Sequence, residues 1–132
     1  MGEISLFCRA ISDYKAAGIL IQNLDADDNI VDIVGYHLQQ AVEKLLKFQI
    51  EMQGEQYPFT HDITLLLDAI EHIPKWLDKY KETLMQYSTK TRYSSMRVAS
   101  KKTIFLLYDE IGKYIETIRP TKQTDASAKP NL

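Results

Sequence analysis

The chain has 132 residues, with 16 Lys and Arg against 18 Asp and Glu, and a formal net charge of −2 at pH 7. This length fits one domain, 45% hydrophobic residues is enough for a core, and the lack of a basic excess argues against a dedicated duplex-DNA binder. The single cysteine, Cys8, excludes an internal disulfide framework and a four-cysteine zinc site. No run is long and apolar enough to cross a bilayer, so we expect a cytoplasmic protein without membrane association.

Apolar residues recur at helical spacing through the first half of the chain. From residue 7 to residue 24 they are three or four positions apart, and the short polar run 25–29 that follows is typical of a turn. The same spacing continues from Ile30 to Met52, and Gly54 lies where a glycine commonly ends a helix. The pattern predicts two helices, of which the second is the longer.

Three further segments show helical spacing. Thr60 is predicted to cap a third helix, with its apolar residues between positions 63 and 73, and Pro74 to break or kink it before a fourth segment. Residues 88–95 are predicted to form a loop, and a last helix is expected to end at Arg119 and Pro120. We therefore expect an all-α, up-and-down bundle of four to five helices over residues 1–120, followed by a disordered tail at 121–132.

A band of polar residues lies opposite the apolar face of the second predicted helix. It consists of Tyr36, Gln40, Glu43, Lys44, Lys47 and Glu51, with His37 at its edge. Glu43 with Lys47, and Lys47 with Glu51, have the i,i+4 spacing of stabilising charge pairs. On spacing alone the band is an ordinary solvated face, and Asp13, Asp32 and Asp68 are likewise expected to be solvated helix residues.

Two segments resemble the signature of the HEPN family, named for its occurrence in higher eukaryotes and prokaryotes and for nucleotide binding. They are YHLQQAVEKLLK at residues 36–47 and PFTHDI at residues 58–63. The resemblance implies a bundle of four or five helices, commonly a homodimer, often encoded beside a minimal nucleotidyltransferase with which it acts as a two-component system. Several members of that family are metal-independent ribonucleases of toxin–antitoxin or defence systems.

The HEPN ribonucleases carry an arginine followed four to six residues later by a histidine. The histidines of this chain are His37, His61 and His72, and none follows an arginine at that spacing. Because RNA cleavage needs a group that titrates near neutrality beside the phosphate, an active ribonuclease of the usual kind is not expected. A toxin ribonuclease with a divergent site stays as an alternative hypothesis.

A basic segment near the last predicted helix favours anionic ligands. Between residues 88 and 108 there are five positive charges and no acid, with Tyr93 available to stack on a base. We interpret the chain as a non-catalytic, nucleotide-binding or interaction subunit that dimerises and pairs with a minimal nucleotidyltransferase, with a nucleotide or RNA as the candidate ligand. A stand-alone nucleotide- or anion-binding dimer is a further alternative. No catalytic residue, metal or cofactor is assigned, and the candidate ligand contacts are Lys44, Lys47, His61, Arg92 and Tyr93.

Overall fold

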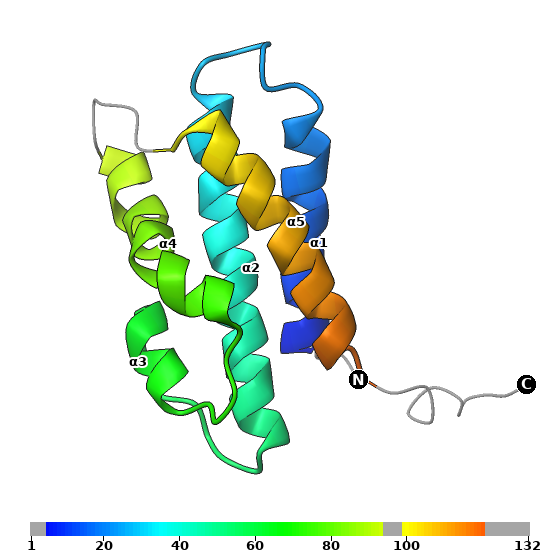
Figure 1. Ribbon diagram of the computed structural model, residues 1–132, viewed down its shortest axis with the longest axis vertical. Helices are drawn as coiled ribbons and strands as arrows, with labels where there is room; N and C mark the ends of the chain where they lie inside the picture. The colour runs from blue at the N-terminus through cyan, green and yellow to red at the C-terminus, as the bar shows by residue number, and fades with distance from the viewer. Residues whose placement is uncertain (1–4, 94–98, 121–132) are drawn as a thin grey trace, which may run out of the picture.

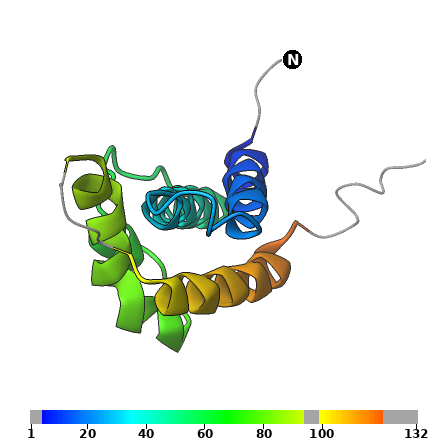
Figure 2. The same ribbon diagram turned by 90° about the horizontal axis from the view of Figure 1, so that it is seen from above.

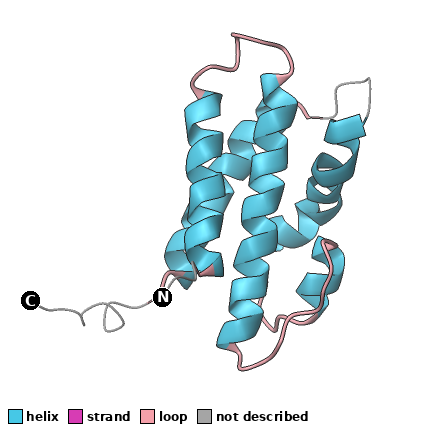
Figure 3. Cartoon of the chain, turned by 180° about the vertical axis from the view of Figure 1, so that it is seen from behind, coloured by secondary structure: helices cyan, strands magenta, loops and turns pink. Residues whose placement is uncertain are grey.

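A computed structural model describes residues 5–93 and 99–120, and within these ranges the chain is helical with no strand (Figure 1). The elements are α1 (Leu6–Ile21), α2 (Ile30–Met52), α3 (Ile63–Asp68), α4 (Lys75–Tyr93) and α5 (Lys101–Ile118). Helices α1, α2, α4 and α5 alternate in direction, and the short α3 lies beside the lower half of α2 (Figures 1 and 3). The predicted all-α bundle is confirmed, and none of these helices is long and apolar enough to span a membrane.

The bundle is organised around α2. This helix contacts α1, α3, α4 and α5, and seen from above it lies between α1 and α4 with α5 crossing beneath (Figure 2). Its buried residues extend from Val31 to Ile50, nearly its whole length. Since most of its circumference is covered, even polar residues on α2 have little access to solvent.

Helix α3 begins later and ends earlier than predicted. Asp62, not Thr60, is its N-cap: the Asp62 carboxylate accepts a hydrogen bond from the Thr64 backbone N–H at 2.9 Å. Thr60 acts one step earlier, with its hydroxyl accepting from the Asp62 N–H at 3.0 Å. The helix ends at Asp68, whereas Ile70 stays in the core outside any helix. Beyond Asp68 the apolar residues keep a helical spacing because they pack against the core, although their backbone is not helical.

Helix α4 is longer than predicted at its C-terminal end. Pro74 separates the two helices, as the predicted break requires: it lies directly before α4, where its carbonyl accepts from the backbone N–H groups of Leu77 and Asp78. The helix continues to Tyr93 through a stretch without apolar spacing, so the predicted loop at 88–95 is wrong as far as residue 93. The predicted disordered tail, 121–132, lies outside the described residues.

Helices α1 and α5 are joined by two interlocked tyrosines. The rings of Tyr14 and Tyr108 are stacked, with centroids 4.5 Å apart and planes 6° apart, and the Tyr14 hydroxyl donates to the Tyr108 carbonyl at 2.9 Å. Each hydroxyl lies over a glycine of the opposite helix, Tyr14 over Gly112 and Tyr108 over Gly18. A methyl group at either glycine would overlap the hydroxyl above it.

Gly112→Ala is therefore expected to destabilise the fold by about 1–3 kcal/mol, because the added methyl displaces the Tyr14 hydroxyl. In a Tyr14→Phe background the nearest atom becomes a ring carbon 3.2 Å away. There the alanine is expected to be nearly neutral, since alanine favours a helix over glycine by about 1 kcal/mol. Urea denaturation of the four proteins of this double-mutant cycle measures the difference. An equal effect of Gly112→Ala in both backgrounds would contradict the assigned contact.

Candidate functional site

The polar band of α2 is organised by two carboxylates, one on α2 and one on α1. Glu43 is 3% exposed and lies inside the band, not on a solvated face. Asp13 of α1 faces the band from the neighbouring helix, with a side chain that is 17% exposed. Each carboxylate holds one lysine and one histidine, so the band consists of two adjacent ion-paired clusters.

Glu43 has three side-chain partners. One carboxylate oxygen accepts from the Gln39 amide at 3.1 Å, and the other lies 3.0 Å from the Lys47 Nζ and 2.8 Å from the His61 Nδ1. The side-chain amide oxygen of Gln39 in turn accepts a hydrogen bond from the side-chain amide of Gln40 at 2.8 Å. Burial alone would raise the pKa of the Glu43 carboxyl, but the hydrogen bonds from His61, Lys47 and Gln39 outweigh it and hold the pKa below its ordinary value of 4.5. Glu43 is therefore ionised at neutral pH.

This ionised carboxylate also fixes the orientation of His61. A carboxylate only accepts hydrogen bonds, so the Nδ1 of His61 carries the proton it donates to Glu43. The imidazole itself is 85% exposed, and among the described residues its Nε2 has no hydrogen-bond partner. Lys47, with a side chain 12% exposed, uses one of its three N–H bonds on Glu43.

The second cluster joins α1 to α2. One Asp13 oxygen lies 3.1 Å from the His37 Nδ1, and the other accepts from the Lys44 ammonium. Burial opposes ionisation of Asp13, but the hydrogen bonds from His37 and Lys44 outweigh it and lower its pKa from the ordinary 3.8. The expectation that Asp13 is a solvated helix residue is wrong.

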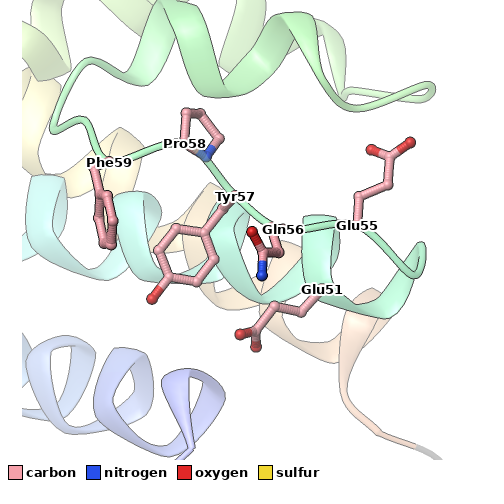
Figure 4. A pocket seen from close by; sticks show the side chains of 6 residues that line it. All are labelled: Glu51, Glu55, Gln56, Tyr57, Pro58 and Phe59. Carbon is pink, nitrogen blue, oxygen red and sulfur yellow. The ribbon is translucent and has the colours of Figure 1, made fainter.

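The connection between α2 and α3 adds aromatic side chains to the first cluster. The Lys47 ammonium lies 5.2 Å from the centre of the Tyr57 ring, close enough for a cation–π contact. Tyr57 also lines a surface hollow of about 410 Å³, with Phe59 fully exposed beside it. Figure 4 shows the side chains of Glu51, Gln56, Tyr57 and Phe59 on one side of the connecting segment and that of Glu55 turned to the other.

A model of the HEPN domain matches residues 5–119. The chain belongs to the HEPN domain family. No curated protein and no solved structure gives a significant match. The family and the all-helical fold agree, and membership indicates a nucleotide- or RNA-related function for this HEPN chain.

The structure separates the predicted ligand contacts of the HEPN chain. Lys47 and His61 come together at Glu43, whereas Lys44 belongs to the Asp13 cluster. The i,i+4 pair of Glu43 with Lys47 was predicted from the spacing, but the contact of His61 with Glu43 was not. Arg92 and Tyr93 are in the last turn of α4, and their side chains lie outside the described part of the chain. In the basic segment, Lys101 is paired with the exposed Asp25 at 2.8 Å.

Among the remaining motif residues, the rings of Tyr36 and His37 pack edge to face, with their centroids 5.8 Å apart. The predicted Lys47–Glu51 pair is absent from the described residues, since Lys47 turns to Glu43 and Tyr57 instead. Asp13, Gln39, Tyr57 and Phe59 were not anticipated as site residues. Within the described ranges, no three His, Cys, Asp or Glu side chains are placed to hold a metal ion.

Glu43→Gln is expected to lower the stability by about 1–3 kcal/mol at pH 7, because Lys47 loses its counter-charge in a mostly buried position. Since the folded-state pKa of Glu43 is depressed, its contribution is fully present above about pH 4.5 and is lost as the pH falls through the folded-state value. Urea denaturation at pH 7 and pH 3 should show a difference between the variant and the unmodified chain at pH 7 that shrinks at pH 3.

Glu71→Gln, at an exposed position, is the matched control and should change the stability little at either pH. A loss for Glu43→Gln that is the same at both pH values, or no loss at pH 7, would contradict the assigned role of Glu43.

Proposed function

We propose that this HEPN chain is a non-catalytic subunit that binds a nucleotide, free or within RNA, at the surface formed by Lys47, Tyr57 and His61. The observation that carries this proposal is the placement of an ammonium group and an exposed imidazole on one buried carboxylate, beside an aromatic ring. The Lys47 ammonium is a donor for phosphate, the His61 Nε2 becomes one when the imidazole carries both ring protons, and aromatic rings are platforms for bases.

The charge of this cluster favours a modest affinity for phosphate. The charges of Glu43 and Lys47 cancel, so the net charge of this cluster is zero with a neutral His61 and +1 with a protonated one. The Lys47 ammonium keeps N–H bonds that Glu43 does not use, and the His61 Nε2 is exposed. Because Glu43 already holds both side chains in place, little conformational entropy is lost on binding.

His61→Ala is expected to weaken binding of AMP and GMP about tenfold at pH 6.5, since it removes a charge-assisted hydrogen bond while Glu43 keeps Lys47 and Gln39. His72→Ala is the matched control, because His72 is also exposed but lies in the connection before α4. Isothermal titration calorimetry measures both. No binding to the unmodified chain at millimolar nucleotide, or equal binding by both variants, would contradict the proposal.

The lack of an Arg–His pair at ribonuclease spacing supports a non-catalytic role, and family members often work with a minimal nucleotidyltransferase. We propose such an enzyme as the partner. Co-expression with the nucleotidyltransferase of a neighbouring gene tests this pairing, and separate elution of the two proteins in size-exclusion chromatography would count against it.

We also propose a homodimer that uses α5 and not α2. Most of the circumference of α2 is already covered by the other helices, whereas α5 keeps Phe105 50% exposed and Leu106 37% exposed. Exposed apolar side chains that cluster on one helix are typical of a protein–protein interface.

Phe105→Asp is expected to convert a dimer of twice 15.2 kDa into a monomer, because a charge in the centre of an apolar interface cannot be desolvated cheaply. Leu65→Asp is the matched control, since Leu65 is 52% exposed on α3. Light scattering after size-exclusion chromatography measures the mass. If the Phe105 variant stays dimeric, or the unmodified chain is monomeric at high concentration, α5 is not the interface.

One observation favours a second function, an RNA-cleaving toxin with a divergent site. A histidine whose Nδ1 is held by a carboxylate and whose Nε2 faces solvent has the arrangement of a general base with its orienting group. Cleavage of RNA by the unmodified chain but not by His61→Ala would establish this function in place of the non-catalytic one. Equal products from both proteins would point to a contaminating nuclease.

A further inference from the structure

We propose that the hollow beside Tyr57 holds a guanine base, which Glu51 and Gln56 recognise. This inference rests on the proposed function, because it takes the phosphate of the same nucleotide to lie at Lys47 and His61. It adds a base preference that the phosphate contacts alone cannot provide.

The hollow has the size and the walls of a base site. Its volume of about 410 Å³ lies within the range of about 300–1,000 Å³ that is usual for small-molecule sites. Its lining includes two aromatic rings, those of Tyr57 and Phe59, and both lie on the same side of the connecting segment (Figure 4). Phe59 is fully exposed, so its ring is accessible for a base to stack on.

Two polar side chains on this side of the connecting segment have unused hydrogen-bonding groups (Figure 4). Glu51 is in the last turn of α2 and Gln56 lies in the connection, and among the described residues neither side chain has a hydrogen-bond or ion-pair partner. The Glu51 carboxylate can only accept, whereas the Gln56 amide can donate and accept. A ligand in the hollow therefore has to offer donors to Glu51.

Guanine fits this requirement better than the other bases. Its pairing edge has two adjacent donors, N1–H and the N2 amino group, next to the O6 acceptor. The donors match the two oxygens of Glu51, and O6 matches the amide N–H of Gln56. Adenine has the unprotonated N1 at this edge, and the single N3–H of uracil lies between two carbonyl oxygens, so both place acceptors against the carboxylate.

The charges around the hollow also fix the orientation of the nucleotide. The Glu51 carboxylate lines the hollow and repels a phosphate, whereas the Lys47 ammonium lies 5.2 Å from the centre of the Tyr57 ring. A nucleotide consequently places its base in the hollow and its phosphate toward Lys47 and His61. The same guanosine 5′-phosphate unit occurs in free nucleotides and in single-stranded RNA.

The test is calorimetric titration of the full chain and of Glu51→Gln with GMP, AMP and inosine 5′-monophosphate, which lacks the N2 amino group. We expect GMP to bind about tenfold more tightly than AMP, with the inosine nucleotide between them. Glu51→Gln should lose the preference for GMP and keep the affinity for AMP. Glu71→Gln, an exposed glutamate away from the hollow, should behave like the unmodified chain.

The outcomes separate the base site from the proposed function. Equal affinities for GMP and AMP, or a GMP preference that survives Glu51→Gln, would overturn the guanine site and leave nucleotide binding intact. No binding of any of the three at millimolar concentration would overturn both. A hexaribonucleotide with one guanine, compared with hexa-adenylate and with GMP, identifies the source: tighter binding of the guanine hexamer than of GMP indicates RNA, and equal binding indicates the free nucleotide.

Discussion

The burial of one carboxylate, that of Glu43, is the constraint on which the polar site of this HEPN chain depends. A carboxylate that is only 3% exposed must be satisfied by hydrogen bonds or by opposite charge. Gln39, Lys47 and His61 supply these, and in doing so they lose the freedom of solvated side chains. The requirement that stabilises Glu43 therefore also holds an ammonium and an imidazole at one place on the surface.

The position of α2 explains why a polar motif is buried at all. Because α1, α3, α4 and α5 surround this helix, its polar face lies under α1 and under the connection to α3. Asp13 of α1 satisfies Lys44 and His37, and the connection brings His61 and Tyr57 over Glu43 and Lys47. The motif residues consequently serve two purposes: they join helices in the bundle, and they leave a few selected groups exposed.

Periodicity and local spacing predicted the helices and the Glu43–Lys47 pair, because both depend on residues less than two turns apart. Spacing did not predict the structure of segments without apolar periodicity, or contacts between residues far apart in the sequence. Residues 88–93 lack apolar spacing yet contain no breaker, so α4 continues through them. Asp13 carries no local signal of its contacts, which lie 24 and 31 positions away in His37 and Lys44. The family resemblance marked His61 as part of a motif, but only the three-dimensional fold shows that it meets Glu43.

Chemical-shift mapping of the isotope-labelled chain during titration with GMP tests most directly whether Glu43 holds Lys47 and His61 where a nucleotide binds. We expect the largest perturbations at Lys47, Tyr57, Phe59 and His61, and we expect Glu43→Gln to reduce them. Perturbations concentrated elsewhere, for example around Trp76 and Tyr114 at the hollow between α4 and α5, would contradict it.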